Sequence, residues 1–341
     1  MHRGGLIHMV TSWYRRSVLR LCYVYVISIA GIQRMRRTFD AANVTRSDLR
    51  LKKIIANPTD TKPVRVAIYS DSNGREWLVK TWGGVFDDFH RLSLENEAAA
   101  YMAFQHTVTR EFASGAIVHI PTVESFADVS GEFVLVREFI DGVVLSDVDD
   151  QRDRDRVFWL VLGQFKTVAR GIPQDWLTRI RELPSWIVLA SYWMFLPVAF
   201  AARRGYRRDI YVSVWLYCKL FILCVPHAFS KHVLVHRDIH AKNIVLRNEQ
   251  IVLIDMGECV LANPVLEYVY AVTAESVMEE SQYLGMIDRI YHTVLADRRQ
   301  RRLFYLFLLV RCVGLLSEAD MPQLRVQKFC RIIAHIRIAV K

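Results

Sequence analysis

Asp238, Asn243 and Asp255 are the residues of this 341-residue sequence whose types and spacing indicate chemistry. Asn243 follows Asp238 by five positions, and Asp255 follows Asn243 by twelve. Carboxylate and amide oxygens are hard ligands of the kind that Mg²⁺ prefers. We therefore expect Asn243 and Asp255 to point toward one divalent-cation site, with the carboxylate of Asp238 nearby.

Two short apolar runs are expected to position these side chains. Residues 244–246 form the first run, 247–250 are polar, and 251–254 form a second run that ends at Asp255. Strand-forming runs separated by a short polar turn are typical of a hairpin. In such a hairpin Asn243 and Asp255 lie at the same open end, and the loop that carries Asp238 precedes it.

The stretch HRDIHAKN at 236–243 resembles the H-x-D-x-x-x-x-N catalytic loop of the protein-kinase-like superfamily. Asp255-Met256-Gly257 resembles its metal-binding D-F-G motif, with Met in place of Phe. His240 is similar to the second histidine in the H-G-D-L-H-P-G-N loop of aminoglycoside phosphotransferases, choline kinases and lipopolysaccharide-core kinases, whereas Arg237 follows the protein-kinase pattern. The resemblance implies an ATP-dependent phosphotransferase that uses Mg²⁺ or Mn²⁺. Asp238 would then deprotonate the acceptor hydroxyl, and Asn243 and Asp255 would hold the metal.

The residues that would hold the nucleotide phosphates are sought upstream. Two strands are expected at 64–69 and 76–82, and Asn73-Gly74 between them is typical of a hairpin turn. Lys80 on the second strand matches the lysine that kinase-like proteins place on the phosphates. A helix is expected at 93–104, and we take Glu97 as the partner of Lys80, with Glu95 as the alternative.

Residues 133–142 read as a strand that leaves through a turn at Gly142. The segment resembles the hinge between kinase lobes, and by this resemblance the backbone of Glu138 and Ile140 would bind adenine. A glycine-rich loop over the phosphates is not expected, because the corresponding connection at 57–63 contains no glycine.

The resemblance implies an α+β, two-lobed protein-kinase-like fold, with a small β-rich N-lobe and a larger, mainly helical C-lobe. The expected divisions are a basic and apolar helical segment at 1–47, the N-lobe at 48–142 and the C-lobe at 143–341.

The composition is basic and apolar for a soluble protein. The net charge is +10, the mean hydropathy is +0.14 and hydrophobic residues make up 52% of the chain. Anionic surfaces or substrates are favoured by this charge, but no nucleic-acid-binding signature accompanies it, so no nucleic acid is expected. The six cysteines form no C-x-x-C pair, which fits a reduced cytoplasmic compartment.

Several apolar stretches lie beside arginines. Residues 21–33 are uncharged between arginines and predict an interfacial helix or one packed on the protein body. Residues 183–202 are long enough to span a bilayer, and 210–229 are nearly so. Two spans would place the arginines of 203–208 on the face away from ATP, against the positive-inside tendency. We therefore expect large-lobe helices and a peripheral position on the cytoplasmic face of an anionic membrane.

Alternative functions remain open at this point. The acceptor is expected to be a hydroxyl on a small molecule or on an envelope glycan or lipid-linked sugar. A serine/threonine protein kinase is favoured by Arg237 and opposed by the short segment after Asp255. A membrane-associated pseudokinase is the third alternative, and a metal hydrolase built from His232, His236 and His240 on a helix is the fourth.

Overall fold

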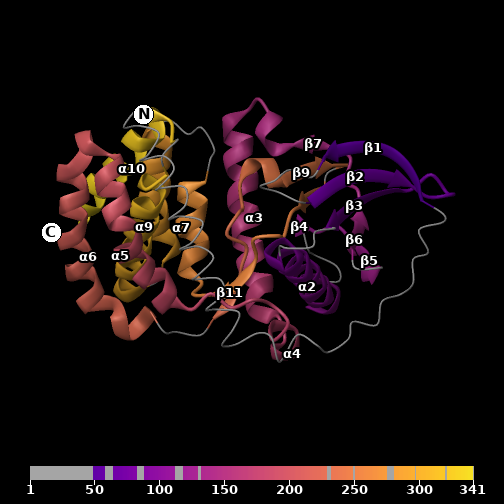
Figure 1. Cartoon of the computed structure of the whole chain (residues 1–341), viewed down its shortest axis with the longest axis horizontal. Helices are drawn as coiled ribbons and strands as arrows, with labels where there is room; N and C mark the ends of the chain where they lie inside the picture. Colours follow the sequence, from indigo (N-terminus) through magenta and orange to yellow (C-terminus); the bar gives the residue numbers. More distant parts are fainter. Residues whose placement is uncertain are drawn as a thin grey trace, which may run out of the picture. The chain divides into compact units, whose positions relative to one another are not determined.

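The computed structural model describes residues 49–57, 64–82, 88–111, 118–129, 132–228, 232–248, 250–274, 280–295, 297–318 and 321–340. The chain divides into two compact units. Of the described residues, the first unit, called the sheet unit, comprises those within 49–181 and 233–261. The second, called the helical unit, comprises those within 182–232 and 262–340 (Figure 1).

A five-stranded antiparallel sheet forms one part of the sheet unit, in the order β1-β2-β3-β6-β5. Its strands are β1 (Arg50–Ala56), β2 (Val64–Ser70), β3 (Glu76–Trp82), β5 (Val123–Val129) and β6 (Glu132–Glu138). The predicted β2–β3 hairpin is confirmed, and Gly74 at its turn has a φ of +77°, which glycine adopts without strain.

A second sheet has the order β4-β10-β9-β7 and contains the predicted hairpin of the catalytic region. Its strands are β4 (Val118–His119), β7 (Val143–Val144), β9 (Ile244–Arg247) and β10 (Gln250–Leu253). A two-stranded pair, β8 (Val233–Val235) and β11 (Val260–Ala262), lies before and after this hairpin in the chain. Asn248 at the hairpin turn has a φ of 46°, a value that asparagine tolerates better than most residues.

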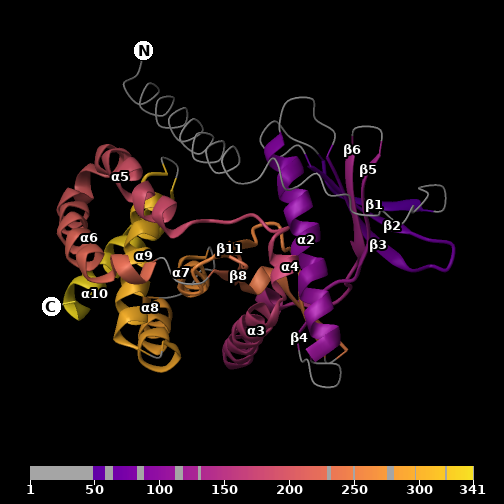
Figure 2. The same ribbon diagram turned by 90° about the horizontal axis from the view of Figure 1, so that it is seen from below.

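Helices α2 (Asp88–Glu111) and α3 (Gln151–Gly171) complete the core of the sheet unit (Figure 2). α2 is longer than the predicted 93–104 and buries an alanine-rich face, including Ala98, Ala100 and Tyr101. Phe104 of α2 stacks on Phe165 of α3, with ring centroids 5.3 Å apart. The remaining short elements are η2 (Leu145–Asp147), α4 (Gln174–Leu177) and η4 (Ala241–Asn243).

The helical unit is organised around α9 (Arg298–Leu316), whose side chains from Leu303 to Leu316 are mostly buried. Around it lie α5 (Ser185–Ala202), η3 (Arg204–Tyr206), α6 (Arg207–Ala228), α7 (Val265–Thr273), α8 (Glu280–Arg289), η5 (Ile290–Val294) and α10 (Gln323–Ala339). Among the described residues, α5 is the one helix long and apolar enough to cross a membrane.

Some predictions fall outside the described residues. These are the helical segment at 1–47 and the glycine-free connection at 57–63, of which only Asn57 is described. The lobe boundary near residue 142 stays a prediction. In the structure, β6 of the first sheet ends at Glu138 and β7 of the second sheet begins at Val143.

Candidate active site

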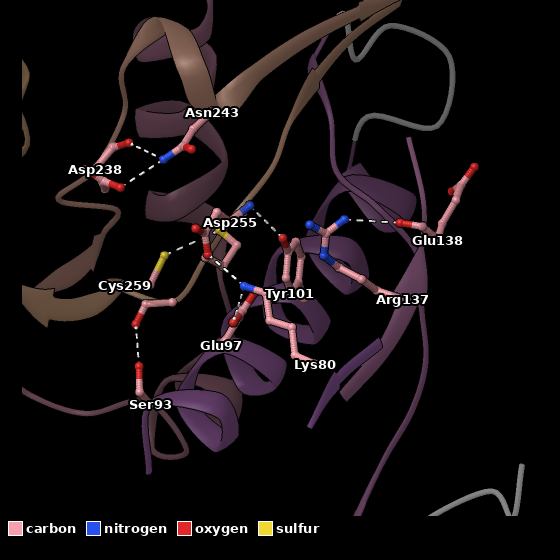
Figure 3. Close-up of polar contacts among 12 residues, drawn as sticks. Lys80, Ser93, Glu97, Tyr101, Arg137, Glu138, Asp238, Asn243, Asp255 and Cys259 are labelled. Atoms are coloured by element: carbon pink, nitrogen blue, oxygen red, sulfur yellow. Dashed lines mark hydrogen bonds and ion pairs between the residues drawn. The ribbon is translucent and has the colours of Figure 1, made fainter. Parts of the chain in front are cut away.

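Lys80, Glu97 and Asp255 form a cluster of charges in the sheet unit (Figure 3). Nζ of Lys80 on β3 lies 2.7 and 2.9 Å from the two carboxylate oxygens of Glu97 on α2. The same ammonium group lies 3.0 Å from Oδ1 of Asp255, just after β10. The side chain of Glu97 is 2% exposed, whereas that of Asp255 is 46% exposed, so the accessible side of the cluster is the Asp255 carboxylate.

The electrostatics of this cluster keep Lys80 and Asp255 charged. Burial alone would lower the pKa of Lys80, but the carboxylates of Glu97 and Asp255 raise it above its ordinary value. Burial raises the pKa of Glu97, and the attraction of Lys80 opposes this shift. The pKa of Asp255 is lowered to about 2, chiefly by the Lys80 ammonium group. An ionised oxygen ligand at Asp255 suits a hard divalent cation.

The backbone of Asp255 is held in an unusual conformation by Tyr101. Asp255 has a φ of 66°, in the left-handed region that few non-glycine residues occupy. Its backbone amide donates a 2.8 Å hydrogen bond to the hydroxyl of Tyr101, which is completely buried on α2. The guanidinium of Arg137 lies 5.7 Å from the centroid of the Tyr101 ring. Tyr101 therefore fixes the direction in which the Asp255 carboxylate projects.

The segment after Asp255 is tied to the same helix. The hydroxyl of Ser93 donates to the carbonyl of Gly257 at 3.3 Å, and the amide of Asn96 donates to the carbonyl of Cys259 at 2.5 Å. A Cβ atom at Gly257 would lie 3.3 Å from Oδ1 of Asp255 and 3.5 Å from Oε2 of Glu97. Glycine at this position leaves room for the two carboxylates.

Asp238 and Asn243 form a second group. Nδ2 of Asn243 donates to the carbonyl of Asp238 at 3.0 Å and to its Oδ2 at 2.9 Å (Figure 3). The backbone carbonyl of Asn243 accepts from the amide of Ile254 at 2.8 Å, so Asn243 lies beside the residue that precedes Asp255. Nδ2 of Asn243 makes both of these hydrogen bonds to Asp238. The side-chain oxygen Oδ1 of Asn243 is therefore the atom that could bind a cation.

Two histidines of the loop at 236–243 have defined tautomers. Nδ1 of His240 accepts from the amide of Lys242 at 3.1 Å, so in the neutral ring the proton lies on Nε2, which is 3.4 Å from Oδ1 of Asp238. Nδ1 of His236 accepts from the amide of Asp238 at 3.3 Å. His236 is completely buried, and burial lowers its pKa to about 4, so it is neutral near pH 7. His240 and Asn243 thus contact the two carboxylate oxygens of Asp238.

Glu138 and Ile140 lie where the predicted hinge leaves the first sheet. The amide of Glu138 donates to the carbonyl of Thr122 at 2.8 Å, and its carboxylate accepts from Arg247 at 3.1 Å. Arg137 donates to the carbonyl of Glu138 at 3.1 Å. A Cβ at Gly142 would overlap the carbonyl of Leu246, so glycine is needed where the chain enters the second sheet. The adenine-binding role of Glu138 and Ile140 stays a prediction.

The structure places Lys80, Glu97 and Asp255 in one cluster and pairs Asp238 with Asn243, but it also contains contacts that the sequence reasoning missed. Tyr101 lies four residues after Glu97, which is the spacing of one helix face. Arg137 lies on the same sheet face as Lys80, because Leu135 pairs with Lys80 and side chains two apart share a face.

The metal-hydrolase hypothesis is wrong. Strand β8 separates His232 from His236, so the three histidines do not share a helix face. Nδ1 of His232 lies 2.6 Å from Glu182, whereas His240 contacts Asp238. Among the described residues, no group of three or more His, Cys, Asp and Glu side chains is arranged to hold a metal ion.

The sequence matches a family model described as the phosphotransferase enzyme family over residues 66–304. No curated protein matches the chain significantly. The match at 66–304 includes every residue assigned above to the candidate site.

Solved structures of aminoglycoside phosphotransferases share the fold. One from Alicyclobacillus acidocaldarius has a TM-score of 0.53 and 13% identity, covering 90% of this chain and 99% of that one. A thermostable mutant of a second aminoglycoside phosphotransferase, in ternary complex with ADP and hygromycin B, has a TM-score of 0.52 and 14% identity, covering 86% and 93%. A spectinomycin phosphotransferase in complex with ADP and spectinomycin has a TM-score of 0.51 and 16% identity, covering 86% and 95%. The predicted kinase-like α+β fold is confirmed.

Proposed function

The chain belongs to the phosphotransferase enzyme family and is a kinase-type phosphotransferase, and we propose that it transfers the γ-phosphate of ATP to a hydroxyl group of a small molecule or an envelope glycan. The observation that carries this proposal is the arrangement of the two groups described above. Lys80, Glu97 and Asp255 are suited to nucleotide phosphates, and Asp238 with Asn243 is suited to the acceptor side of the reaction.

Each group has a separate role in this proposal. Lys80, braced by Glu97, would position the phosphates, because a buried ammonium group paired with one carboxylate retains its charge and its place. Asp238, with Oδ2 bonded to Asn243 and Oδ1 facing His240, would orient the acceptor hydroxyl and take its proton. Nucleotide use is further supported by the relatives of the same fold that were solved with ADP.

A divalent cation fits the residues present. Asp255 is ionised, its carboxylate is accessible, and the side-chain oxygen of Asn243 is the atom that its bonds to Asp238 leave for a cation. Mg²⁺ or Mn²⁺ held by Asn243 and Asp255 would neutralise charge on the phosphates.

A small or glycan acceptor is favoured over a protein. Helix α7 begins at Val265, so only a short segment, partly in β11, follows Asp255 before the next helix. A long activation segment that could dock a protein substrate does not fit in this interval. Relatives of the same fold were solved with hygromycin B or spectinomycin, which are hydroxyl-bearing small molecules.

Nucleotide binding is tested by thermal unfolding of the full chain. ATP should raise the Tm only when Mg²⁺ or Mn²⁺ is present, because Asp255 would hold the cation that offsets the charge of the phosphates. Asp255→Asn should abolish this rise, and Asp238→Asn should keep it. An ATP effect that is independent of the metal and of Asp255 would contradict the assignment.

Acceptor class is tested by transfer from labelled ATP to three acceptors: an aminoglycoside, an envelope glycan and a generic protein substrate. Label on a glycan or amino sugar supports the proposal, provided that Asp238→Asn abolishes it. Label on the protein alone would instead favour the protein-kinase alternative, and wild-type turnover by Asp238→Asn would show that Asp238 is not the base.

A further inference from the structure

Helices α5 and α6 each expose an apolar stripe. On α5, Trp186, Trp193 and Phe200 are 46%, 48% and 39% exposed and lie seven residues apart. On α6, Tyr211, Trp215 and Ile222 are 73%, 53% and 75% exposed at spacings of four and seven. Residues at these spacings share one helix face. We call the two stripes together the α5–α6 face.

The opposite sides of the same helices hold them in the helical unit. Leu189, Tyr192 and Ala199 of α5 are buried, and the hydroxyls of Tyr192 and Ser213 are 2.8 Å apart. Tyr217 of α6 stacks on Tyr192 with ring centroids 4.1 Å apart and donates to the carbonyl of Leu189. Both helices also contact α9 (Figure 2). The exposed stripes therefore belong to a packed helix pair and are not its core side.

The α5–α6 face is basic at its tip and nearly free of acids. Arg204 of η3 and Arg207 and Arg208 at the start of α6 are exposed, and the guanidinium of Arg207 lies 5.1 Å from the ring centroid of Phe200. The ammonium of Lys219 lies 5.0 Å from the ring of Trp215. α5 contains no charged residue, and Asp209 is the one acid of α6. Cations thus lie directly beside exposed aromatic rings.

We propose that the α5–α6 face docks on an anionic lipid bilayer. Tryptophan and tyrosine are favoured at the boundary between headgroups and acyl chains, and arginine is favoured beside anionic headgroups. α5 is long and apolar enough to cross a membrane, yet only 28% of it is buried, which is unlike the mostly buried core helix of a soluble protein. Acidic side chains that would repel headgroups are nearly lacking.

Interfacial docking fits α5 better than a span. A spanning α5 would have to leave the contacts that Leu189 and Tyr192 make with α6, and it would lose the Tyr192–Ser213 hydrogen bond. Docking keeps these contacts and buries only side chains that are already exposed. The proposal is independent of the phosphotransfer reaction, because none of its residues belongs to the candidate active site.

The first test is flotation of the full chain with vesicles. Vesicles of phosphatidylcholine with phosphatidylserine should carry the protein upward at low salt, and pure phosphatidylcholine should carry less. Replacing the three tip arginines together should weaken binding by on the order of 100-fold, since each arginine near an anionic surface contributes about fivefold, which corresponds to about 1 kcal/mol. The matched control replaces three exposed arginines of α3. The tested set is Arg204→Gln, Arg207→Gln and Arg208→Gln, and the control set is Arg152→Gln, Arg156→Gln and Arg170→Gln.

The second test separates the apolar stripe from charge. Phe200→Gln, Trp215→Gln and Ile222→Gln together should lower binding at least tenfold without changing the net charge, and they leave the Trp193 ring on Tyr192 and Tyr217. Three exposed apolar residues of β1 provide the control, changed to Leu51→Gln, Ile54→Gln and Ile55→Gln. The Tm and its rise with ATP and Mg²⁺ should be unchanged in the stripe variant, which shows that folding and nucleotide binding are intact.

A third measurement leaves the face unchanged. Cys218 is exposed on α6, whereas Cys224, Cys259, Cys312 and Cys330 are buried. In a Cys22→Ser protein, anionic vesicles should protect Cys218 from a water-soluble thiol reagent. Absence of flotation at low salt, undiminished binding of the stripe variant, or a Cys218 that reacts equally with and without vesicles would each overturn the proposal. If residues 1–33 carried the binding instead of the α5–α6 face, the stripe variant would bind the vesicles as well as the wild type does.

Discussion

Tyr101→Phe isolates the hydrogen bond that holds the backbone of Asp255. The substitution removes one oxygen from a completely buried side chain and keeps the ring beside Arg137. The amide of Asp255 then loses its 2.8 Å acceptor while its φ of 66° still has to be maintained. Because left-handed backbone is unfavourable for most residues, the carboxylate of Asp255 should become less well oriented.

The expected effects follow from the loss of that acceptor. A buried donor left without a partner costs about 1–3 kcal/mol of stability. For a domain of 150–250 residues each kcal/mol lowers the Tm by roughly 2–4 °C. In the variant, part of the binding free energy, about 1–2 kcal/mol, is spent on restoring the position of Asp255. The Kd for ATP with Mg²⁺ should therefore rise roughly 5–30-fold. Thermal unfolding and a nucleotide titration measure the two effects.

Tyr192→Phe is the matched control. Tyr192 is also completely buried, and its hydroxyl makes one 2.8 Å contact, with Ser213 in the helical unit. Tyr192→Phe should lower the Tm less than Tyr101→Phe, because the hydroxyl of Ser213 keeps its hydrogen bond to the carbonyl of Ile210, and it should leave the Kd for ATP unchanged. Equal nucleotide affinities in the two variants and the wild type would refute the reasoning that Tyr101 positions Asp255.

Three further predictions concern the catalytic loop. Asp238→Asn should lower single-turnover phosphate transfer by about 10²–10⁴-fold while nucleotide affinity is kept, because only the proton acceptor is lost. His240→Ala should lower kcat by about 10–100-fold at unchanged KM for ATP, since Oδ1 of Asp238 loses its neighbour. His236 has its pKa lowered from 6.5 to about 4 on folding, so its contribution to stability is fully present above pH 6.5 and is lost as the pH falls toward 4. Urea unfolding should show this loss, about 3 kcal/mol, in the wild type relative to His236→Gln, and parallel pH profiles for the two proteins would contradict it.

Local patterns were sufficient to predict the elements that carry the site. The two hairpins follow from apolar runs separated by Asn73-Gly74 and by the polar turn 247–250, and both form as predicted. The Lys80–Glu97 contact was predictable because Lys80 lies on a predicted strand and Glu97 on the predicted helix that follows, as the kinase-like resemblance of residues 236–243 implies. Short-range signals of this kind are independent of how distant segments pack.

Contacts between distant segments could not be predicted in the same way. Tyr101 lies 154 positions from Asp255, and its aromatic side chain within an apolar helix reads as core in the sequence. The helical nature of 183–202 was evident, but which of its side chains are buried depends on α6 and α9. The tautomer of His240 depends on the hydrogen bond that the amide of Lys242 donates to its Nδ1. That bond forms only when the loop has folded, so the sequence does not predict the tautomer.

Helix α2 explains why the segment that begins at Asp255 has so few conformational options. Ser93, Glu97 and Tyr101 are spaced by four residues and therefore project from one face of the helix. That face contacts the carbonyl of Gly257, the ammonium of Lys80 and the amide of Asp255, respectively. A shift of α2 along its axis would disturb all three contacts together, whereas a change in the hairpin alone would be resisted by each of them. The orientation of the Asp255 carboxylate is therefore determined by α2 as well as by the hairpin that precedes it, and variants along this helix face should affect nucleotide binding non-additively.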